Sequence, residues 1–210
     1  MLIIGLTGSI GMGKSTAAAH LRQRGIAVFD ADAAVHALYS GAAVPLIEAA
    51  FPGTTANGVV DRRLLLQSLM SDTSGFARLE AIVHPLVREA ERVFLEGEHA
   101  RHAAVAVLEI PLLFETGGDK LVDVTVVVSA GPQEQRRRVL ERPGMTDAKL
   151  AEILSRQMAD AEKRRRADFV VDTSRGVPEM AAQMDRILAE IASRPAGAYQ
   201  RCWSGGEARL

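Results

Sequence analysis

The chain has 210 residues, a hydrophobic content of 48% and a formal net charge of −1. This length suits one well-buried α/β domain with insertions, and the weak net charge argues against nucleic acid or an acidic membrane as a partner. The single cysteine, Cys202, excludes an internal disulfide framework, and no apolar run is long enough to span a bilayer, so we expect a cytoplasmic protein of undetermined oligomeric state.

The first predicted element is a short buried strand, Leu2–Leu6, which runs directly into a glycine-rich loop and so does not look like a secretory leader. The loop, Gly8-Ser9-Ile10-Gly11-Met12-Gly13-Lys14-Ser15, fits G-x-x-x-x-G-K-[ST], the pattern of a phosphate-binding loop or P-loop. A helical stretch from Ser15 to Arg22 follows, with Gly25 as its expected stop. The strand, loop and helix therefore occur in the order that this motif requires.

The residue types of this loop explain what it would bind. Glycines permit tight backbone turns whose N–H groups converge on an anion, and the N-terminus of the next helix adds partial positive charge. We predict that Lys14 reaches the β- and γ-phosphates of a nucleoside triphosphate, that the Ser15 hydroxyl ligates Mg²⁺ and that Thr16 supports the α-phosphate. The predicted nucleotide-binding residues are Gly8, Gly11, Met12, Gly13, Lys14, Ser15 and Thr16.

Apolar segments separated by helical ones recur along the chain. Uninterrupted apolar runs of this kind are typical of strands buried on both faces of a parallel sheet, so we predict a doubly wound, five-stranded parallel α/β sheet of the P-loop type. The five expected strands are Leu2–Leu6, Ile26–Phe29, Ala103–Leu108, Val124–Val128 and Phe169–Val171.

Between Asp32 and Arg101 the chain shows helical patterns and no convincing strand. We expect a helical, substrate-binding insertion over residues 33–101, at the carboxyl ends of the strands where ligands bind in such sheets. Its expected helices are Ala33–Tyr39, Pro45–Phe51, Arg62–Met70, Gly75–Ile82 and Pro85–Glu98.

A second helical region, residues 132–166, resembles a lid because it combines a basic run, Gln135–Arg142, with an amphipathic stretch. The expected organisation is therefore one domain over residues 1–194, with a core of residues 1–32 and 103–194. Residues 195–210 are glycine-rich and aperiodic, and we expect them to form a flexible tail.

Three classes of P-loop protein compete at this point. A GTPase needs an Asn-Lys-x-Asp guanine reader, but the only asparagine, Asn57, precedes Gly58. An ATPase motor needs an apolar strand that ends in an acidic pair, whereas the closest match, Val105–Glu109, ends in a single glutamate. A kinase needs an acceptor pocket and a closing lid, which the insertion and the basic helices supply. A nucleotide-dependent binding protein is the alternative that is not an enzyme.

Two acidic residues follow the second expected strand, in the sequence "FDADAAVH". A carboxylate there accepts a proton from an acceptor hydroxyl or holds Mg²⁺ through water, while the other caps the helix that begins near Ala33. We favour Asp32 for the chemical role, as base or as metal-shell residue, over Asp30.

Other charged residues admit two interpretations each. Arg138 and Arg142 are four apart and share a helix face, which suits either a polyphosphate or solvent. His84 is either a ligand of the acceptor or simply the residue before Pro85 at a helix start. The basic run Lys163–Arg166 is better explained as a lid hinge or a solvated face than as a nucleic-acid site. The other histidines lack a metal-ligand spacing.

Over nearly its whole length, from Leu2 to about Ile191, the chain resembles the dephospho-CoA kinase family. The marks are "IGLTGSIGMGKST", "DAD" (Asp30–Asp32), His84-Pro85, "PLLFE" (Pro111–Glu115), Arg138 with Arg142, Gln157, and "ADFVVD" (Ala167–Asp172). The resemblance implies transfer of the γ-phosphoryl group of ATP, with Mg²⁺, to the ribose 3′-hydroxyl of dephospho-CoA, the last step of coenzyme A synthesis. A P-loop kinase for another small acceptor, such as a nucleoside monophosphate or a hydroxy acid, is the alternative.

The resemblance also assigns roles. Asp32 is implied to be the base near the 3′-hydroxyl, Lys14, Arg138 and Arg142 to act on the phosphates, and residues 167–172 to lead to the adenine of ATP. The implied acceptor-binding residues are Asp32, His84, Pro111, Leu112, Leu113 and Glu115.

The chain departs from the family pattern at four positions. Ser9 stands where glycine is usual and Met12 where serine is usual, which leaves the glycines of the loop pattern intact. Glu109 lies where an aspartate is common, and Thr173 follows "ADFVVD" where asparagine is common. Threonine keeps a hydrogen-bonding group but lacks the amide, so the adenine contacts differ most from the pattern.

Overall fold

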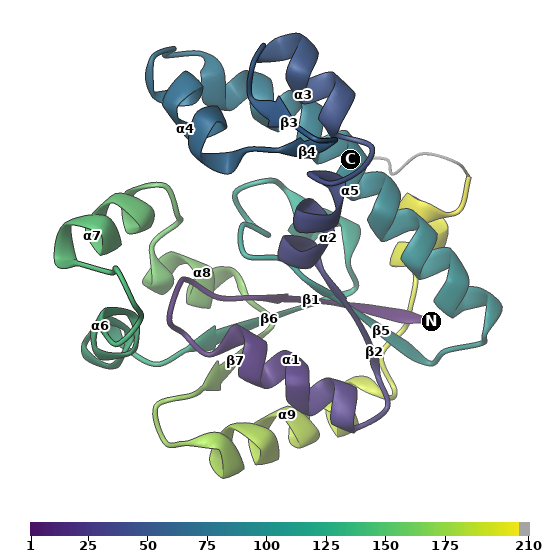
Figure 1. The fold of residues 1–210 in the computed structure, drawn as a ribbon. Coiled ribbons are helices and arrows are strands. Elements are labelled where there is room, and N and C mark those ends of the chain that lie inside the picture. The colour runs from purple at the N-terminus through teal and green to yellow at the C-terminus, as the bar shows by residue number, and fades with distance from the viewer. Residues whose placement is uncertain (206–210) are drawn as a thin grey trace. The chain divides into compact units, whose positions relative to one another are not determined.

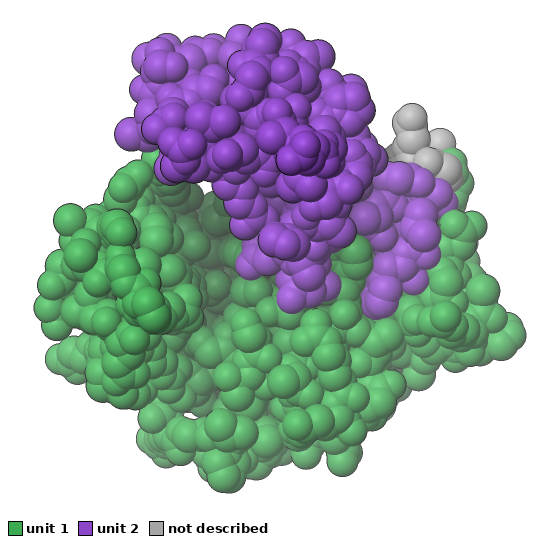
Figure 2. Space-filling view, in the orientation of Figure 1, with its two compact units in different colours: residues 1–29, 95–210 green, residues 30–94 purple. Residues whose placement is uncertain are grey.

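The computed structural model describes residues 1–205 and divides the chain into two compact units. Unit 1 consists of residues 1–29 and the chain from Leu95 onward, and unit 2 consists of residues 30–94 (Figure 2). Within the described residues, no helix combines the length and the hydropathy that crossing a bilayer requires.

Unit 1 is built on a five-stranded sheet with the strand order β2-β5-β1-β6-β7 (Figure 1). The central strand β1 pairs in parallel with β5 and β6, and β6 pairs in parallel with β7. The predicted fold class is confirmed, and each strand lies within two residues of its expected position at either end. The strands are β1 (Leu2–Thr7), β2 (Ala27–Asp30), β5 (Val105–Glu109), β6 (Val124–Ser129) and β7 (Phe169–Asp172).

Two helices, α1 (Lys14–Gln23) and α9 (Val177–Ile191), lie side by side against this sheet (Figure 1). Apolar residues spaced three and four apart bring one face of each helix into a shared core with the buried strands. In α1 this face holds Ala17, Ala18 and Leu21, and in α9 it holds Met180, Met184, Ile187 and Ile191. This packing fixes the start of α1, and with it the loop that precedes the helix.

The region expected to be a lid contains three short helices, α6 (Pro132–Leu140), α7 (Asp147–Ser155) and α8 (Asp160–Arg166). Contacts join α6 to α7, and α8 packs against β6. The Thr146 hydroxyl caps α7 by accepting the N–H of Lys149.

Unit 2 is mainly helical and has its own core, in which Ile47, Phe51, Leu65 and Leu69 are buried. Its elements are α2 (Ala31–Leu38), α3 (Val44–Ala50), β3 (Thr55–Ala56), β4 (Val59–Val60), α4 (Arg62–Met70) and the part of α5 (Gly75–Ala100) up to Phe94.

The hairpin of β3 and β4 corrects the expectation that no strand lies in this region. Asn57 and Gly58 connect the two strands, and both have positive φ angles, 52° and 74°. Asn-Gly is the pair that two-residue hairpin turns prefer, because both central positions need this conformation. The Asn-Gly pair is a turn signal in the sequence, but strands of two residues are too short to show an alternation of apolar and polar residues.

Helix α5 corrects a second expectation, because it continues through Pro85, where two helices were expected. Proline has no N–H to offer the carbonyl of Ala81, so the helix lacks one hydrogen bond there. The apolar side chains Phe76, Leu79, Ile82 and Leu86 still pack on the core of unit 2. Continuous packing on both sides of the proline offsets the local cost.

The segment after Pro195 also differs from its expectation as a flexible tail. Residues Tyr199–Trp203 form a turn of π-helix (η2), and the Trp203 side chain is buried. The indole Nε1 donates to the carbonyl of Leu121, at the end of the 3₁₀-helix η1 (Gly118–Leu121), over 2.8 Å. The correction applies up to residue 205, and residues 206–210 lie outside the described residues.

Candidate active site

The phosphate-loop motif joins β1 to α1 and has the backbone that its glycines permit. Gly11 and Gly13 have φ angles of 77° and 90°, in the left-handed region that favours glycine. At Gly8, a Cβ atom would lie 2.5 Å from Cγ2 of Val128 and 2.8 Å from the Val128 carbonyl oxygen. The first glycine is therefore required by packing, and the other two by conformation.

This backbone leaves several donors available to a ligand. Among the hydrogen bonds of residues 1–205, none uses the N–H groups of Gly11, Gly13, Lys14 or Ser15. Gly13 caps α1 without a side-chain acceptor, so the helix N-terminus also lacks an internal partner. Unpaired N–H groups at a helix N-terminus form a site for an anion such as a phosphate.

Side chains from distant parts of unit 1 hold the loop from behind. Gln135 Nε2 donates to the carbonyl of Ile10 over 2.8 Å, and the N–H of Ile10 donates to Gln157 Oε1 over 3.3 Å. The Thr173 hydroxyl donates to the carbonyl of Met12 over 2.8 Å. The Met12 side chain is buried and its sulfur accepts the N–H of Ala130, so only its backbone can face a nucleotide.

Lys14, the first residue of α1, is paired inside the protein. Its Nζ lies 2.8 Å from Oε1 of Glu109, the last residue of β5, and this carboxylate is only 2% exposed. Arg22 Nη2 approaches the other oxygen at 3.5 Å. The buried glutamate thus holds the Lys14 ammonium beside the loop, where incoming phosphates would compete for it.

The Ser15 hydroxyl is the predicted ligand of Mg²⁺, and Thr16 is the predicted support of the α-phosphate. Ser15 and Thr16 are exposed in the first turn of α1, next to the unpaired N–H groups. No group of three or more His, Cys, Asp or Glu residues within the described chain is arranged to bind a metal. A serine hydroxyl is a ligand that Mg²⁺ can take beside phosphate oxygens and water, and the metal role of Ser15 stays a prediction.

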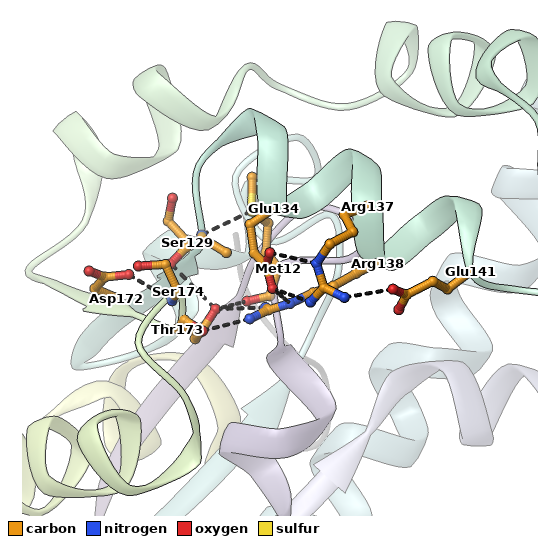
Figure 3. Close-up of polar contacts among 10 residues, drawn as sticks. Met12, Ser129, Glu134, Arg137, Arg138, Glu141, Asp172, Thr173 and Ser174 are labelled. Carbon is orange, nitrogen blue, oxygen red and sulfur yellow. Dashed lines mark hydrogen bonds and ion pairs between the residues drawn. The ribbon is translucent and has the colours of Figure 1, made fainter.

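Arg138 on α6 connects the lid region to the phosphate loop (Figure 3). Its Nη1 donates to the Thr173 hydroxyl over 3.1 Å, its Nη2 to the Thr173 carbonyl over 2.6 Å, and its Nε to Glu134 Oε1 over 2.8 Å. Thr173 in turn binds Met12. Arg138 is therefore oriented by two residues, and its two remaining N–H groups are available to a ligand.

Glu134 accepts from both Arg137 and Arg138 (Figure 3). The hydrogen bond from Arg137, followed by that from Arg138, lowers the pKa of the Glu134 carboxyl from 4.5 to about 2. The carboxylate is therefore ionised throughout the neutral range and forms ion pairs with both arginines of α6.

Next to this network lies a hollow of about 300 Å³. The phosphate loop contributes Gly11 and Gly13, α6 contributes Arg138, and the residues after β7 contribute Thr173 and an apolar patch. The full lining is Gly11, Gly13, Thr16, Arg138, Arg142, Thr173, Gly176, Val177 and Met180. The guanidinium of Arg142 is exposed and has no ion-pair partner among residues 1–205. The structure thus brings both predicted arginines to the predicted phosphate loop.

The segment Pro111–Glu115 follows β5 and contains both core and polar positions. Leu113 is fully buried, in the space that a Cβ on Gly5 of β1 would fill, and Phe114 is also buried. Glu115 pairs with Lys163 at 2.9 Å and accepts the N–H of Met158 at 2.7 Å. Leu113 is therefore a packing residue, whereas Pro111, Leu112 and Glu115 are partly exposed.

In unit 2, the two aspartates are distinguished by their contacts. Asp30 Oδ1 accepts the N–H of Ala33 over 3.0 Å and so caps α2. Asp32 is exposed in the first turn of the same helix. It lines a hollow of about 450 Å³ with Val35, Tyr39, Arg62, Leu65, Leu66, Leu69 and Leu79. Asp32 is thus available to a ligand, while Asp30 has a structural role.

Two more residues of unit 2 bear on this hollow. Arg62 Nη2 lies 2.7 Å from His36 Nδ1, and its guanidinium stacks over the Tyr39 ring at 5.4 Å from the centroid. Burial raises the pKa of the Tyr39 hydroxyl, against a smaller opposing effect of Arg62. His84 is exposed in the middle of α5, before Pro85, and does not line the hollow.

Comparison with known proteins identifies the family. The sequence model described as dephospho-CoA kinase matches residues 2–179. The chain belongs to the dephospho-CoA kinase family. Relatives named dephospho-CoA kinase include one from Rhodopseudomonas palustris (strain HaA2), 56% identical over 93% of this chain and 98% of the relative. Another, from Brucella melitensis, is 52% identical over 94% of this chain and 99% of the relative.

Solved structures share this fold. A crystal structure of a Thermus thermophilus protein matches with a TM-score of 0.78 and 38% identity, over 90% of this chain and 97% of the other. A dephospho-CoA kinase from Campylobacter jejuni matches with a TM-score of 0.69 and 22% identity, over 90% and 96%. A shikimate kinase from Acinetobacter baumannii matches with a TM-score of 0.52 and 19% identity, over 94% and 96%. The last two likenesses show the fold alone, which is that of P-loop kinases.

For several residues around the site of this dephospho-CoA kinase family member, the sequence analysis did not predict the contacts that the structure shows. They are Gln135 behind the phosphate loop, Arg22 beside Glu109, Arg62 and Tyr39 in the hollow of unit 2, and Lys163 beneath the Pro111–Glu115 loop. Each contacts a residue far along the chain or sits on a helix face without a motif. The sequence carries a signal for the position of Arg62 only, because Asp61 before it is a residue type that caps helices and so indicates that a helix starts at Arg62.

Proposed function

We propose that this protein transfers the γ-phosphoryl group of ATP to the ribose 3′-hydroxyl of dephospho-CoA, forming CoA and ADP in the final step of coenzyme A biosynthesis. The observation that carries the proposal is the phosphate loop with its unpaired N–H groups, in a chain that matches the dephospho-CoA kinase family over residues 2–179. The two substrates are ATP and dephospho-CoA. We place the reaction in the cytoplasm, without nucleic-acid partners.

The loop residues divide the work of holding ATP. The N–H groups of Gly11, Gly13, Lys14 and Ser15 bind phosphate oxygens, with Gly8 and the Met12 backbone shaping the turn and Thr16 beside them. The Lys14 ammonium leaves Glu109 for the β- and γ-phosphates, and Glu109 then retains Arg22 as its neighbour. The hollow lined by Thr173, Val177 and Met180 is where the adenosine would lie.

Magnesium is proposed as the metal that accompanies ATP. The Ser15 hydroxyl would hold it, together with phosphate oxygens and water. When bound, the ion supplies charge neutralisation at the β- and γ-phosphates.

Asp32 is proposed as the base. Its carboxylate is exposed, is not used as a helix cap, and lines the hollow of unit 2, whose leucines suit the apolar parts of an acceptor. There it would accept or orient the proton of the 3′-hydroxyl. Arg62, in the same hollow, offers a cation for an acceptor phosphate, while Pro111, Leu112, Glu115 and His84 remain proposals for acceptor contacts.

Arg138 and Arg142 are proposed to stabilise the transferring phosphoryl group. Charge spreads over its equatorial oxygens in the transition state, and two guanidinium groups on one helix match that charge. Positioning and charge neutralisation would supply most of the rate.

The test is ADP release from ATP and Mg²⁺ with different acceptors. We expect stimulation by dephospho-CoA, with CoA as the product, and none by nucleoside monophosphates, shikimate or gluconate. Stimulation by one of those other acceptors would keep the kinase chemistry and reject the substrate. Slow hydrolysis of ATP that no acceptor stimulates would instead indicate a nucleotide-dependent binding protein.

A further inference from the structure

Lys163 on α8 is the fully buried member of a basic run. Its side chain is 0% exposed, whereas Arg164, Arg165 and Arg166, which follow it, are exposed. Removing an ammonium group from water is costly unless it is paired and hydrogen-bonded. A buried lysine therefore needs a partner that compensates for the lost hydration of its ammonium group.

The partners of Lys163 belong to the loop that follows β5. Its Nζ lies 2.9 Å from Glu115 Oε1 and donates to the carbonyl of Pro111 over 3.2 Å. One ammonium thus holds both ends of the Pro111–Glu115 loop. Between them, buried Leu113 fixes the middle of the loop against β1.

The pair is not arranged for maximal stability. Glu115 Oε1 accepts from both Lys163 and the N–H of Met158, while the buried Oε2 has no hydrogen-bond partner among the described residues. An unpaired buried carboxylate oxygen costs free energy, and an apolar pair of the same size would avoid that cost. The arrangement therefore favours a role in placing groups over a role in stability alone.

Two short routes lead from this pair to the phosphate loop. The carbonyl of Pro111 that accepts from Lys163 also accepts from the hydroxyl of Thr7, the last residue of β1 and the neighbour of Gly8. Gln157, next to Met158, accepts the N–H of Ile10 in the phosphate loop itself. Pro111, which accepts from Lys163, thus contacts Thr7 just before the phosphate loop. Gln157, the neighbour of Met158, contacts Ile10 within the loop.

Helix α8 is itself fixed at both ends, so Lys163 can hold the Pro111–Glu115 loop in a defined position. The Ser129 hydroxyl, at the end of β6, donates to Asp160 over 2.8 Å at the start of α8. Arg166, near its end, pairs with Asp119 at 3.0 Å and stacks over Phe114. Lys163 projects from the middle of a helix that is anchored at both ends.

We propose that Lys163 is a positioning residue for phosphoryl transfer, which fixes the Pro111–Glu115 loop relative to the phosphate loop through Glu115 and the Pro111 carbonyl. The inference rests on the proposed function, where this loop lies on the acceptor side. Losing the pair should impair use of the acceptor more than binding of ATP. Two carbonyls of the phosphate loop, those of Ile10 and Met12, have other donors, Gln135 and Thr173, which the substitution leaves in place.

The experiment compares Lys163→Met with the double variant Lys163→Met/Glu115→Gln. The single variant leaves the Glu115 carboxylate, whose Oε2 atom is buried, without its cation and should lower the melting temperature. The double variant removes both charges, and its glutamine oxygen can still accept the N–H of Met158. It should therefore recover most of the melting temperature. Arg164→Met, an exposed neighbour in the same run, is the matched control and should behave as wild type.

Steady-state kinetics then separate positioning from stability. In the double variant we expect the KM for dephospho-CoA to rise about ten-fold or more, with the KM for ATP changed less than about three-fold. Calorimetric titration of dephospho-CoA without ATP should show the same weakening. Wild-type acceptor kinetics in a double variant of restored stability would overturn the inference and make the pair structural.

Two further outcomes are distinguishable. If wild-type protein shows no turnover with dephospho-CoA, the proposed function fails and the inference falls with it. If wild type turns over and the double variant does not fold, Glu115→Gln alone decides the question. It weakens the ion pair while keeping the contact between Lys163 and Pro111, so an unchanged KM for dephospho-CoA in that variant would reject the proposal.

Discussion

Lys14 is held in an ion pair whose carboxylate, on Glu109, is almost fully buried, so its ammonium is already beside the unpaired N–H groups of the phosphate loop. Once it has left Glu109 for the phosphates, this cation stabilises the negative charge that develops on them during transfer. We expect Lys14→Ala to lower kcat by roughly 10²–10³-fold, the usual effect of removing one such electrostatic contact. Steady-state ADP release checks this value.

The control for Lys14→Ala must account for Glu109, which the substitution leaves buried without its closest cation. Lys14→Ala/Glu109→Gln removes both charges and should restore stability in urea unfolding without restoring kcat. Lys120→Ala changes an exposed lysine and should leave kcat unaltered. Near-normal turnover in a folded Lys14→Ala protein would remove the lysine from the mechanism.

Asp30 and Asp32 provide a matched pair of substitutions. Asp32→Asn removes the proposed base, and general bases contribute typically 10²–10⁴-fold, so kcat should fall by about that factor while the KM for ATP changes little. Asp30→Asn should be close to wild type, because asparagine caps helices as well as aspartate does and can still accept the N–H of Ala33. Kinetics with varied ATP and varied acceptor check both.

The results for the two aspartates have distinct meanings. A loss of ATP affinity alone in Asp32→Asn would identify a residue of the metal shell. A large loss of kcat in Asp30→Asn would show that Asp30 takes part in the reaction as well as capping α2.

At the scale of elements, the five strands were predictable because each is a contiguous apolar run between helical segments. The hairpin at Asn57-Gly58 was missed because two-residue strands carry no periodic pattern. Helix α5 was divided at Pro85 because local rules treat proline as a break, whereas side-chain packing on both sides of it keeps the helix continuous.

The candidate site shows the same division between local and distant information. The phosphate loop is contiguous in sequence, so its glycines and Lys14 were predictable from spacing. Lys163 was assigned to a hinge or solvated face because a charge run usually is one, and only the fold brings Glu115, 48 positions earlier, beside it. The contacts of Thr173 with Arg138 and Met12 likewise depend on β7 ending beside the loop.

Helix α6 allows a prediction about pH. Its Glu134 carboxyl has its pKa lowered to about 2 by Arg137 and Arg138, from an ordinary value of 4.5. A group whose folded-state pKa is depressed contributes stability that is fully present above the unfolded value and is lost as the pH falls toward the folded value. The contribution of Glu134 should therefore be constant above about pH 5.5 and decline below about pH 4.5.

The measurement is urea unfolding of wild type and Glu134→Gln between pH 7 and pH 3.5. The difference in unfolding free energy should be level near neutrality and shrink in the acidic part of the range. Because the carboxylate is partly exposed, added salt should reduce the difference at every pH. A difference that stays the same across the whole pH range would show that the charge of Glu134 is not what stabilises α6.

At the scale of the whole molecule, the segment after Pro195 is linked to β1 through the carboxylate of Asp123. The N–H groups of Gly197 and Ala198 donate to Asp123 Oδ1 over 2.8 and 2.7 Å, and Asp123 Oδ2 accepts the N–H of Ile3 in β1. Tyr199 stacks on His99, with ring centroids 4.1 Å apart. The central strand that leads to the phosphate loop therefore shares one carboxylate with residues near the C-terminus.

Trp203 anchors this segment, being only 2% exposed and hydrogen-bonded through its indole to Leu121. Removing a buried tryptophan side chain typically costs 3–5 kcal/mol, so Trp203→Ala should lower the free energy of unfolding by about that amount in urea titrations. Gln200→Ala, an exposed neighbour in the same turn, should have little effect. If the segment contributed nothing to the fold, Trp203→Ala would unfold at the wild-type urea concentration. The expected result instead makes the C-terminal segment part of the scaffold that holds β1, and through β1 the phosphate loop.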